Sequence, residues 1–120
     1  MKGEEYLTKK KQFDSVYNDG GSWVNHLLVM KANPNGLVLS RYGFSISKRV
    51  GNAVVRNRIK RLLREILRAT PLEPGWDIIF IARSPSAVAG YAKLKKSAES
   101  LLLKARLLVE NYEIIRLEAN

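Results

Sequence analysis

A line of basic side chains is the clearest chemical feature of this 120-residue chain. Arg56, Lys60 and Arg64 recur at every fourth position, so on a helix they would lie about 6 Å apart along its axis. Guanidinium groups bind phosphate oxygens in pairs, and such a line of cations can follow a phosphate backbone. Asn52 and Asn57 add uncharged donors for phosphate, sugar or base. The spacing therefore predicts a surface that binds a polyanion.

The charge balance supports this prediction. The net charge is +10, and residues 48–68 hold eight basic residues against one acidic residue, Glu65. A charge run is usually a solvated surface, but one so unbalanced repels itself unless an anion screens it. We expect the anion to be a nucleic acid or an acidic membrane surface.

Other kinds of chemistry find little support in the residues. The chain has no cysteine and a single histidine, His26, so we expect neither a Ser–His–acid triad nor a thiolate or multi-histidine metal site. The segment 48–53 holds one glycine, which does not make a phosphate-binding loop of the Walker type. We predict no catalytic and no metal-binding residue.

Length and composition predict one domain, residues 1–120, in a reducing cytoplasm. Residues 1–5 lack the apolar core of a signal peptide, and the apolar runs are far shorter than the roughly 20 residues that span a bilayer. We therefore expect no membrane association through a spanning segment.

Periodicity predicts an α+β domain in the order helix, strands, helix, strand, helix. The predicted helices are 7–17, with Thr8 as N-cap and glycines at 20 and 21 as its stop, then 54–69 and 91–109. The predicted strands are 26–32, 41–47 and 76–82, and residues 112–117 form an edge strand or an ordered tail. The turn at 33–36 predicts antiparallel pairing of the first two strands. The crossover through 54–69 predicts parallel pairing of 41–47 with 76–82.

Two sets of side chains on these helices have predicted roles. On helix 54–69 one face is apolar and packs on the core, through Ile59, Leu62, Leu63 and Ile66. Phe13 and Tyr17, four residues apart, offer rings on which unpaired bases can stack. The same spacing is also typical of a core-facing stripe, so both interpretations stay open.

The residues from Phe44 to Glu65 resemble the signature of the bacterial ribonuclease P protein subunit. Its hallmark is Arg56-Asn57-Arg58 followed by Lys60-Arg61, and the similarity extends to 7–20 and 79–83, covering roughly 5–108. The resemblance implies a compact α/β sandwich like the second domain of ribosomal protein S5, with a rare left-handed crossover around the Arg-rich helix. It also implies a noncatalytic protein subunit of an RNA enzyme.

That enzyme removes the 5′ leader from precursor tRNA. The resemblance implies two partners, the catalytic RNA and precursor tRNA, with Mg²⁺ held chiefly by RNA, and no obligate protein partner. It implies that the leader lies in a cleft lined by Phe13, Tyr17 and, on the first strand, Met30. Arg58 borders the apolar face and could instead brace the crossover. The implied RNA contacts are Lys48, Arg49, Asn52, Arg56, Asn57, Arg58, Lys60, Arg61 and Arg64.

Two other functions fit the residues alone. A different binding module, such as a ribosomal protein or a helix that reads a DNA major groove, would rest on the basic amphipathic helix. A protein-only nuclease would need an acid/base cluster, but the acidic residues lie mostly near helix ends and the tail.

Overall fold

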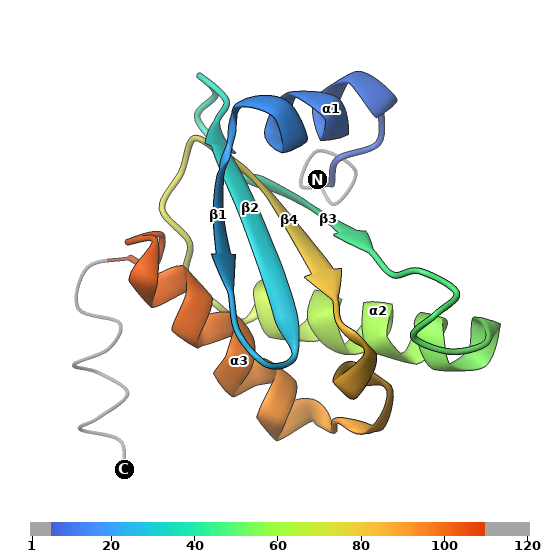
Figure 1. Ribbon diagram of the computed structural model, residues 1–120. Helices are drawn as coiled ribbons and strands as arrows, with labels where there is room; N and C mark the ends of the chain where they lie inside the picture. Colours follow the sequence, from blue (N-terminus) through green and yellow to red (C-terminus); the bar gives the residue numbers. More distant parts are fainter. Residues whose placement is uncertain (1–5, 110–120) are drawn as a thin grey trace, which may run out of the picture.

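The structure, a computed structural model, describes residues 6–109 (Figure 1). It confirms an α+β domain with three α-helices and one four-stranded mixed sheet. Along the chain the elements are α1 (Lys10–Asp19), β1 (Gly21–Val24), β2 (Leu28–Pro34), β3 (Arg41–Ser45), α2 (Ala53–Arg68), β4 (Trp76–Ala82), the 3₁₀ helix η2 (Ser84–Val88) and α3 (Tyr91–Lys104).

The strand order in the sheet is β1-β2-β4-β3. As predicted, β3 pairs with β4 in parallel across the α2 crossover. The predicted antiparallel pairing of the segment 26–32 with 41–47 is wrong, because β4 lies between β2 and β3 and pairs antiparallel with β2. The reason is burial: β4 is apolar on both faces, with Ile78, Ile79 and Phe80 fully buried, and such a strand belongs in the middle of a sheet.

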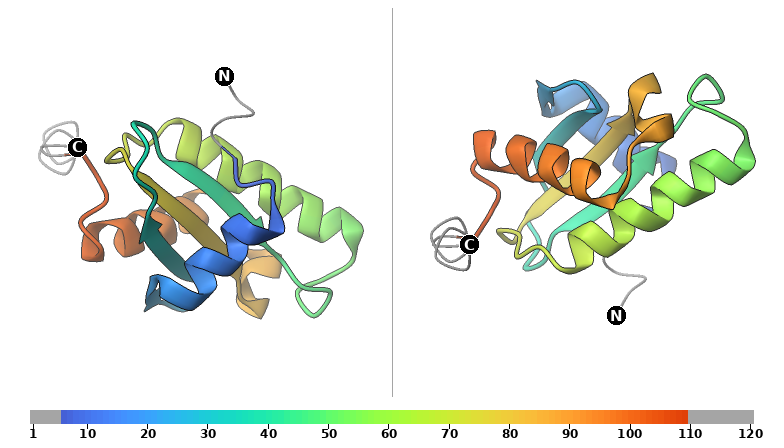
Figure 2. Two further views of the ribbon diagram at one scale, coloured as in Figure 1. Left: turned by 90° about the horizontal axis from the view of Figure 1, so that it is seen from above. Right: turned by 90° about the horizontal axis from the view of Figure 1, so that it is seen from below.

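The sheet separates two apolar layers (Figure 2). On one face, α2 and α3 bury the main core, in which Ile59, Leu63 and Ile66 of α2 are fully buried. Leu62 packs half-buried against this core, and Leu67 is also buried. On the other face, α1 forms a smaller cluster, Leu7, Val16 and Ile79, with Phe13 and Ile81 packed against it.

The crossover from β3 through α2 to β4 is left-handed, as the resemblance implied. In Figures 1 and 2, β3 and β4 point the same way, and α2 lies on the face of the sheet away from α1. If the sheet is viewed from the α1 side and turned so that β3 and β4 point up, α2 lies behind the sheet and β4 lies to the right of β3. A crossover that passes behind the sheet and moves to the right is left-handed.

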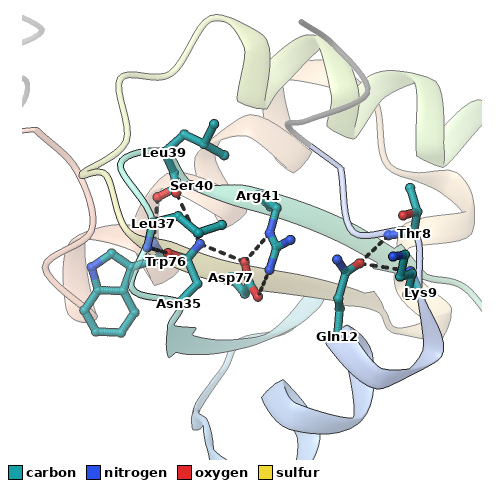
Figure 3. Close-up of polar contacts among 10 residues, drawn as sticks. All are labelled: Thr8, Lys9, Gln12, Asn35, Leu37, Leu39, Ser40, Arg41, Trp76 and Asp77. Atoms are coloured by element: carbon teal, nitrogen blue, oxygen red, sulfur yellow. Dashed lines mark hydrogen bonds and ion pairs between the residues drawn. The ribbon is translucent and has the colours of Figure 1, made fainter.

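Helix α1 begins and ends for reasons that the sequence did not reveal. Its N-cap is Lys9, not Thr8, and the side-chain oxygen of Gln12 accepts the backbone N–H groups of Thr8 at 2.8 Å and Lys9 at 2.9 Å (Figure 3). Gly20 ends the helix with φ −84°, so positive φ is not its purpose. A Cβ there would lie 2.6 Å from the Val16 carbonyl oxygen, so the site requires glycine for space.

Two segments at the ends of elements differ from the prediction. Strand β1 was not predicted, since its glycine and serine at positions 21 and 22 have low strand propensity. Helix α3 ends at Lys104 rather than 109, because Arg106 takes a positive φ of 61° and Leu108 then pairs with Leu72. The predicted segment 112–117 lies outside the described residues.

Candidate nucleic-acid interface

The loop between β3 and α2, including the N-cap of α2, carries three predicted contact residues. Lys48 and Arg49 are exposed in a turn closed by a 3.1 Å bond from the Val50 N–H to the Ser47 carbonyl oxygen. Asn52 is the N-cap of α2, and its Oδ1 accepts the Val55 N–H at 3.0 Å. This cap holds the start of α2, and Asn52 itself is exposed.

The cations of α2 have no carboxylate partner among residues 6–109. Within residues 6–109 the ion pairs join Lys10 to Asp14 and Arg41 to Asp77, away from this helix. The side chain of Arg64 is exposed and that of Arg56 is half-buried, with a buried Nε that has no hydrogen-bond partner within the described part of the chain. A buried donor without an acceptor is costly. The other members of this surface are Asn57 and Arg61, both exposed, and Lys60, half-buried.

Arg58 departs from the other basic residues of the motif. Its two terminal nitrogens donate to the backbone carbonyls of Ala87, at 2.8 Å, and Ala89, at 2.9 Å. These carbonyls belong to the segment that links β4 to α3, so Arg58 holds α2 against that segment, as the structural interpretation of this residue expects. Its role as an RNA contact stays a prediction, and two of its donors already have acceptors inside the protein.

The face of the sheet beneath α1 is only partly covered. Phe13 packs against β3 so closely that a Cβ on Gly43 would lie 2.7 Å from its ring, whereas Tyr17 is 38% exposed. On the same face a row of apolar side chains crosses the sheet, in which Val24 pairs with Val29 and Val29 with Ile81. Val24 is 54% exposed and the other two are half-buried. This surface offers rings and apolar side chains to an unpaired base.

Met30 does not belong to this surface. It is fully buried in the main core on the opposite face of the sheet, where it pairs with Trp23 and Phe80. Its assignment to the leader cleft is therefore corrected, because side chains alternate between the faces of a strand. That alternation places Val29 and Lys31 on the α1 face, and Lys31 is a cation that the sequence analysis missed.

A cavity joins the ring of Phe13 to the basic helix. It has a volume of about 360 Å³, and Phe13 and Gly43 line one side while Lys60 and Arg64 line the other. The cavity lies beside the outer strand of the sheet, β3, with Phe44 also in its wall. Aromatic and cationic groups thus form one continuous surface from α1 to α2, which suits a chain of bases and phosphates.

An ion pair joins β3 to its neighbour β4. Arg41 donates to both carboxylate oxygens of Asp77, at 2.9 and 2.8 Å, and Asn35 donates to the same carboxylate at 2.9 Å (Figure 3). The hydrogen bond with Asp77 raises the pKa of Arg41 above its usual value, so it stays charged. This network ties the outer strand to β4, and so fixes the strand that leads into the basic loop.

Residues 6–109 contain no group of three or more His, Cys, Asp or Glu side chains that could hold a metal ion. None of the helices in this part of the chain is both long and apolar enough to cross a membrane.

Comparisons with known proteins agree with the fold and the motif. A family model, "Ribonuclease P", matches residues 1–106. The ribonuclease P protein component of a Dehalococcoides mccartyi strain is 49% identical over 108 residues, covering 90% of each chain. That of Caldanaerobacter subterraneus subsp. tengcongensis is 44% identical over 106 residues, covering 87% of this chain and 91% of the relative.

Solved structures give the same result. A Staphylococcus aureus RNase P protein, a mutant with defective mRNA degradation activity, has a TM-score of 0.85 at 32% identity and covers 90% of this chain and 93% of its own. The Thermotoga maritima RNase P protein has a TM-score of 0.73 at 28% identity, covering 82% and 94%. Fold and motif thus define a protein subunit of a ribonucleoprotein enzyme.

The chain belongs to the bacterial ribonuclease P protein family. Members of this family are the protein components of the ribonuclease P holoenzyme, which acts in the maturation of tRNA 5′ ends. The family resemblance of residues 44–65 is thereby confirmed.

Proposed function

We propose that this protein binds the catalytic RNA of ribonuclease P through α2 and its preceding loop, and binds the 5′ leader of precursor tRNA beside α1. The observation that carries the proposal is the line of cations on α2, which no carboxylate neutralises within the described chain. Phosphate contacts from such a line position an RNA without reading its sequence.

The leader, being single-stranded, would follow the surface from Tyr17 and Phe13 to the cavity lined by Lys60 and Arg64. Its bases would stack on the aromatic rings, and its phosphates would bond the cations. In this proposal the RNA does the chemistry in the cytoplasm, with Mg²⁺ held chiefly by RNA. The protein lowers the repulsion between the phosphates of the two RNAs.

Reconstitution tests the proposal. The full chain is added to a bacterial ribonuclease P RNA at low Mg²⁺, and the release of the leader from precursor tRNA is measured. We expect strong stimulation with the RNA and no cleavage by the protein alone. A folded protein that gives no stimulation would refute the proposal, and leader removal without the RNA would favour a protein-only nuclease.

A second assay separates the proposal from a duplex-DNA-binding module. Precursor tRNA, mature tRNA and duplex DNA of equal length compete for the labelled protein. We expect precursor tRNA to compete best, because the leader adds stacking contacts beside α1. Preference for duplex DNA would favour the alternative.

A further inference from the structure

A second cavity lies at the other end of the sheet, where the β1–β2 turn, η2 and the first half of α3 meet (Figure 1). Its volume is about 500 Å³, within the usual range for small-ligand sites. None of its lining residues lines the cavity beside Phe13 or belongs to the predicted RNA contacts. The function proposed above therefore assigns no residue of this cavity.

The lining combines an apolar wall with two cations. Leu27, Pro85 and Val88 contribute apolar surface, and Val88 is 90% exposed at the rim. Lys93 and Lys96 stand three residues apart on α3, a spacing that puts both on one side of the helix. No aspartate or glutamate is among the described residues of the lining. The complementary ligand has an apolar body and a negatively charged group.

Hydrogen bonds fix the walls in place. The side chains of Asn25 and Ser97 are joined by a 2.7 Å bond from the Ser97 hydroxyl, and the Asn25 amide donates to the Ser97 carbonyl oxygen at 3.0 Å. The Ser86 hydroxyl donates to the Leu27 carbonyl oxygen at 2.7 Å. These bonds tie the β1–β2 turn to both α3 and η2, so the cavity is formed before a ligand arrives, which lowers the cost of binding.

One wall of the cavity is attached to the basic helix. Arg58 of α2 donates to the carbonyls of Ala87 and Ala89, and Ala89 lines the cavity. The helix that carries the line of cations therefore also holds this wall, through Arg58 on another side of the helix. An unpaired base is flat and largely apolar on its faces, and its phosphate is an anion, which are the two properties that the lining selects.

We propose that this cavity binds one nucleotide, with its base against Leu27, Pro85 and Val88 and its phosphate at Lys93 and Lys96. The nucleotide comes either from an unstacked position in the RNA partner, which rests on the proposed function, or from a free mononucleotide. Both sources share the same chemistry, and two experiments distinguish them.

The first experiment maps RNA contacts by crosslinking. The chain has no cysteine, so Val88→Cys can carry a photoreactive aryl azide at a single position. Val38→Cys is the matched control, because Val38 is 92% exposed but lies in the loop between β2 and β3. Each labelled protein is assembled with the ribonuclease P RNA and first assayed for leader removal. We expect Val88→Cys to crosslink to one RNA site at least several-fold more than the control does.

The second experiment titrates the free chain with adenosine monophosphate and with uridine monophosphate, and follows backbone amide signals by NMR. We expect saturable shifts at residues 27, 89 and 97 if a free mononucleotide is the source. Lys93→Glu should weaken this binding roughly fivefold, as for the loss of one exposed ion pair. Lys104→Glu, the same charge change on α3 outside the cavity, should leave it unchanged.

Either a specific crosslink from Val88→Cys or a saturable shift that Lys93→Glu weakens supports the proposal. Equal crosslinking from both cysteine variants, together with no saturable shift, overturns it. A third titration uses benzoate, an aryl anion that is not a nucleotide. Saturation by benzoate with no response to either nucleotide also overturns the proposal, because the cavity would then bind a different aryl anion. If leader removal itself is not stimulated, the proposed function fails, and the titration alone decides the nucleotide site.

Discussion

The arginines of this chain form two groups that differ in where their hydrogen bonds go. Arg41 and Arg58 have acceptors inside the protein, a carboxylate for the first and two backbone carbonyls for the second. Arg56 and Arg64 of α2 have no carboxylate partner within the described chain, and the Nε of Arg56 is buried without an acceptor. The residue type is the same in both groups, so the hydrogen-bond partner separates a structural arginine from a candidate RNA contact.

The difference predicts opposite results for stability and for RNA binding. Removing an arginine of the first group should destabilise the fold and leave the number of phosphate contacts unchanged. Removing one of the second group should do the reverse. Arg41→Ala, Arg58→Ala and Arg64→Ala each test one side of this contrast.

The largest effect is expected for Arg41→Ala. The variant leaves the carboxylate of Asp77, whose side chain is 9% exposed, with Asn35 as its remaining side-chain partner in the described chain. An uncompensated buried charge of this kind costs about 3 kcal/mol, measured as the change in unfolding free energy by urea denaturation. Arg41→Ala combined with Asp77→Asn should recover part of the loss, and a single variant as stable as the parent would contradict the structural role.

Arg58→Ala should have the next largest effect on stability. Two charge-assisted hydrogen bonds to Ala87 and Ala89 are lost, and such bonds together contribute about 2 kcal/mol. The salt dependence of RNA binding should stay as in the parent, because no phosphate contact is removed. A shallower salt dependence with unchanged stability would return Arg58 to the RNA-contact group.

Tyr17→Ala tests the aromatic part of the surface. Tyr17 is 38% exposed, so its loss should cost little stability, while a lost stacking contact lowers leader binding by about 1–2 kcal/mol. Affinities for precursor tRNA and mature tRNA are compared in the holoenzyme. We expect a loss for precursor tRNA alone, and an equal loss for both substrates would show that Tyr17 does not contact the leader.

Arg64→Ala should have the smallest effect on any single measurement. Its side chain is exposed and has no protein partner in the described chain, so stability should stay within about 0.5 kcal/mol of the parent. The slope of log affinity against log salt should fall by about one unit or less, as for one lost phosphate contact. Lys10→Ala, at an exposed cation paired with Asp14 on α1, is the control and should keep the parental slope.

The sequence predicts well those features that depend on local pattern. Helix α2 and strand β4 follow from their periodicity and apolar run, and the bounds of β4 agree with the structure. The order of the strands could not be predicted, because a turn at 33–36 reverses the chain without choosing its neighbour in the sheet. Burial of β4 decides that order.

The candidate site also combines features that the local sequence predicts with features that depend on contacts distant in the chain. The line of cations on α2 is visible in the sequence because its spacing is helical. The acceptors of Arg58 are not, since they lie 29 and 31 residues away along the chain. Met30 was assigned by resemblance to a position of the cleft, but the alternation of β2 turns its side chain into the core and leaves Lys31 on the open face.

The central claim is that α2 binds RNA through arginines that the protein itself leaves without acceptors. Its most direct test is the salt dependence of affinity for the ribonuclease P RNA, compared between the parent chain, Arg56→Ala/Arg64→Ala and Arg58→Ala. We predict that the double variant lowers the slope by up to about two units, and that Arg58→Ala keeps the parental slope despite its lower stability. An unchanged slope for the folded double variant would contradict the claim.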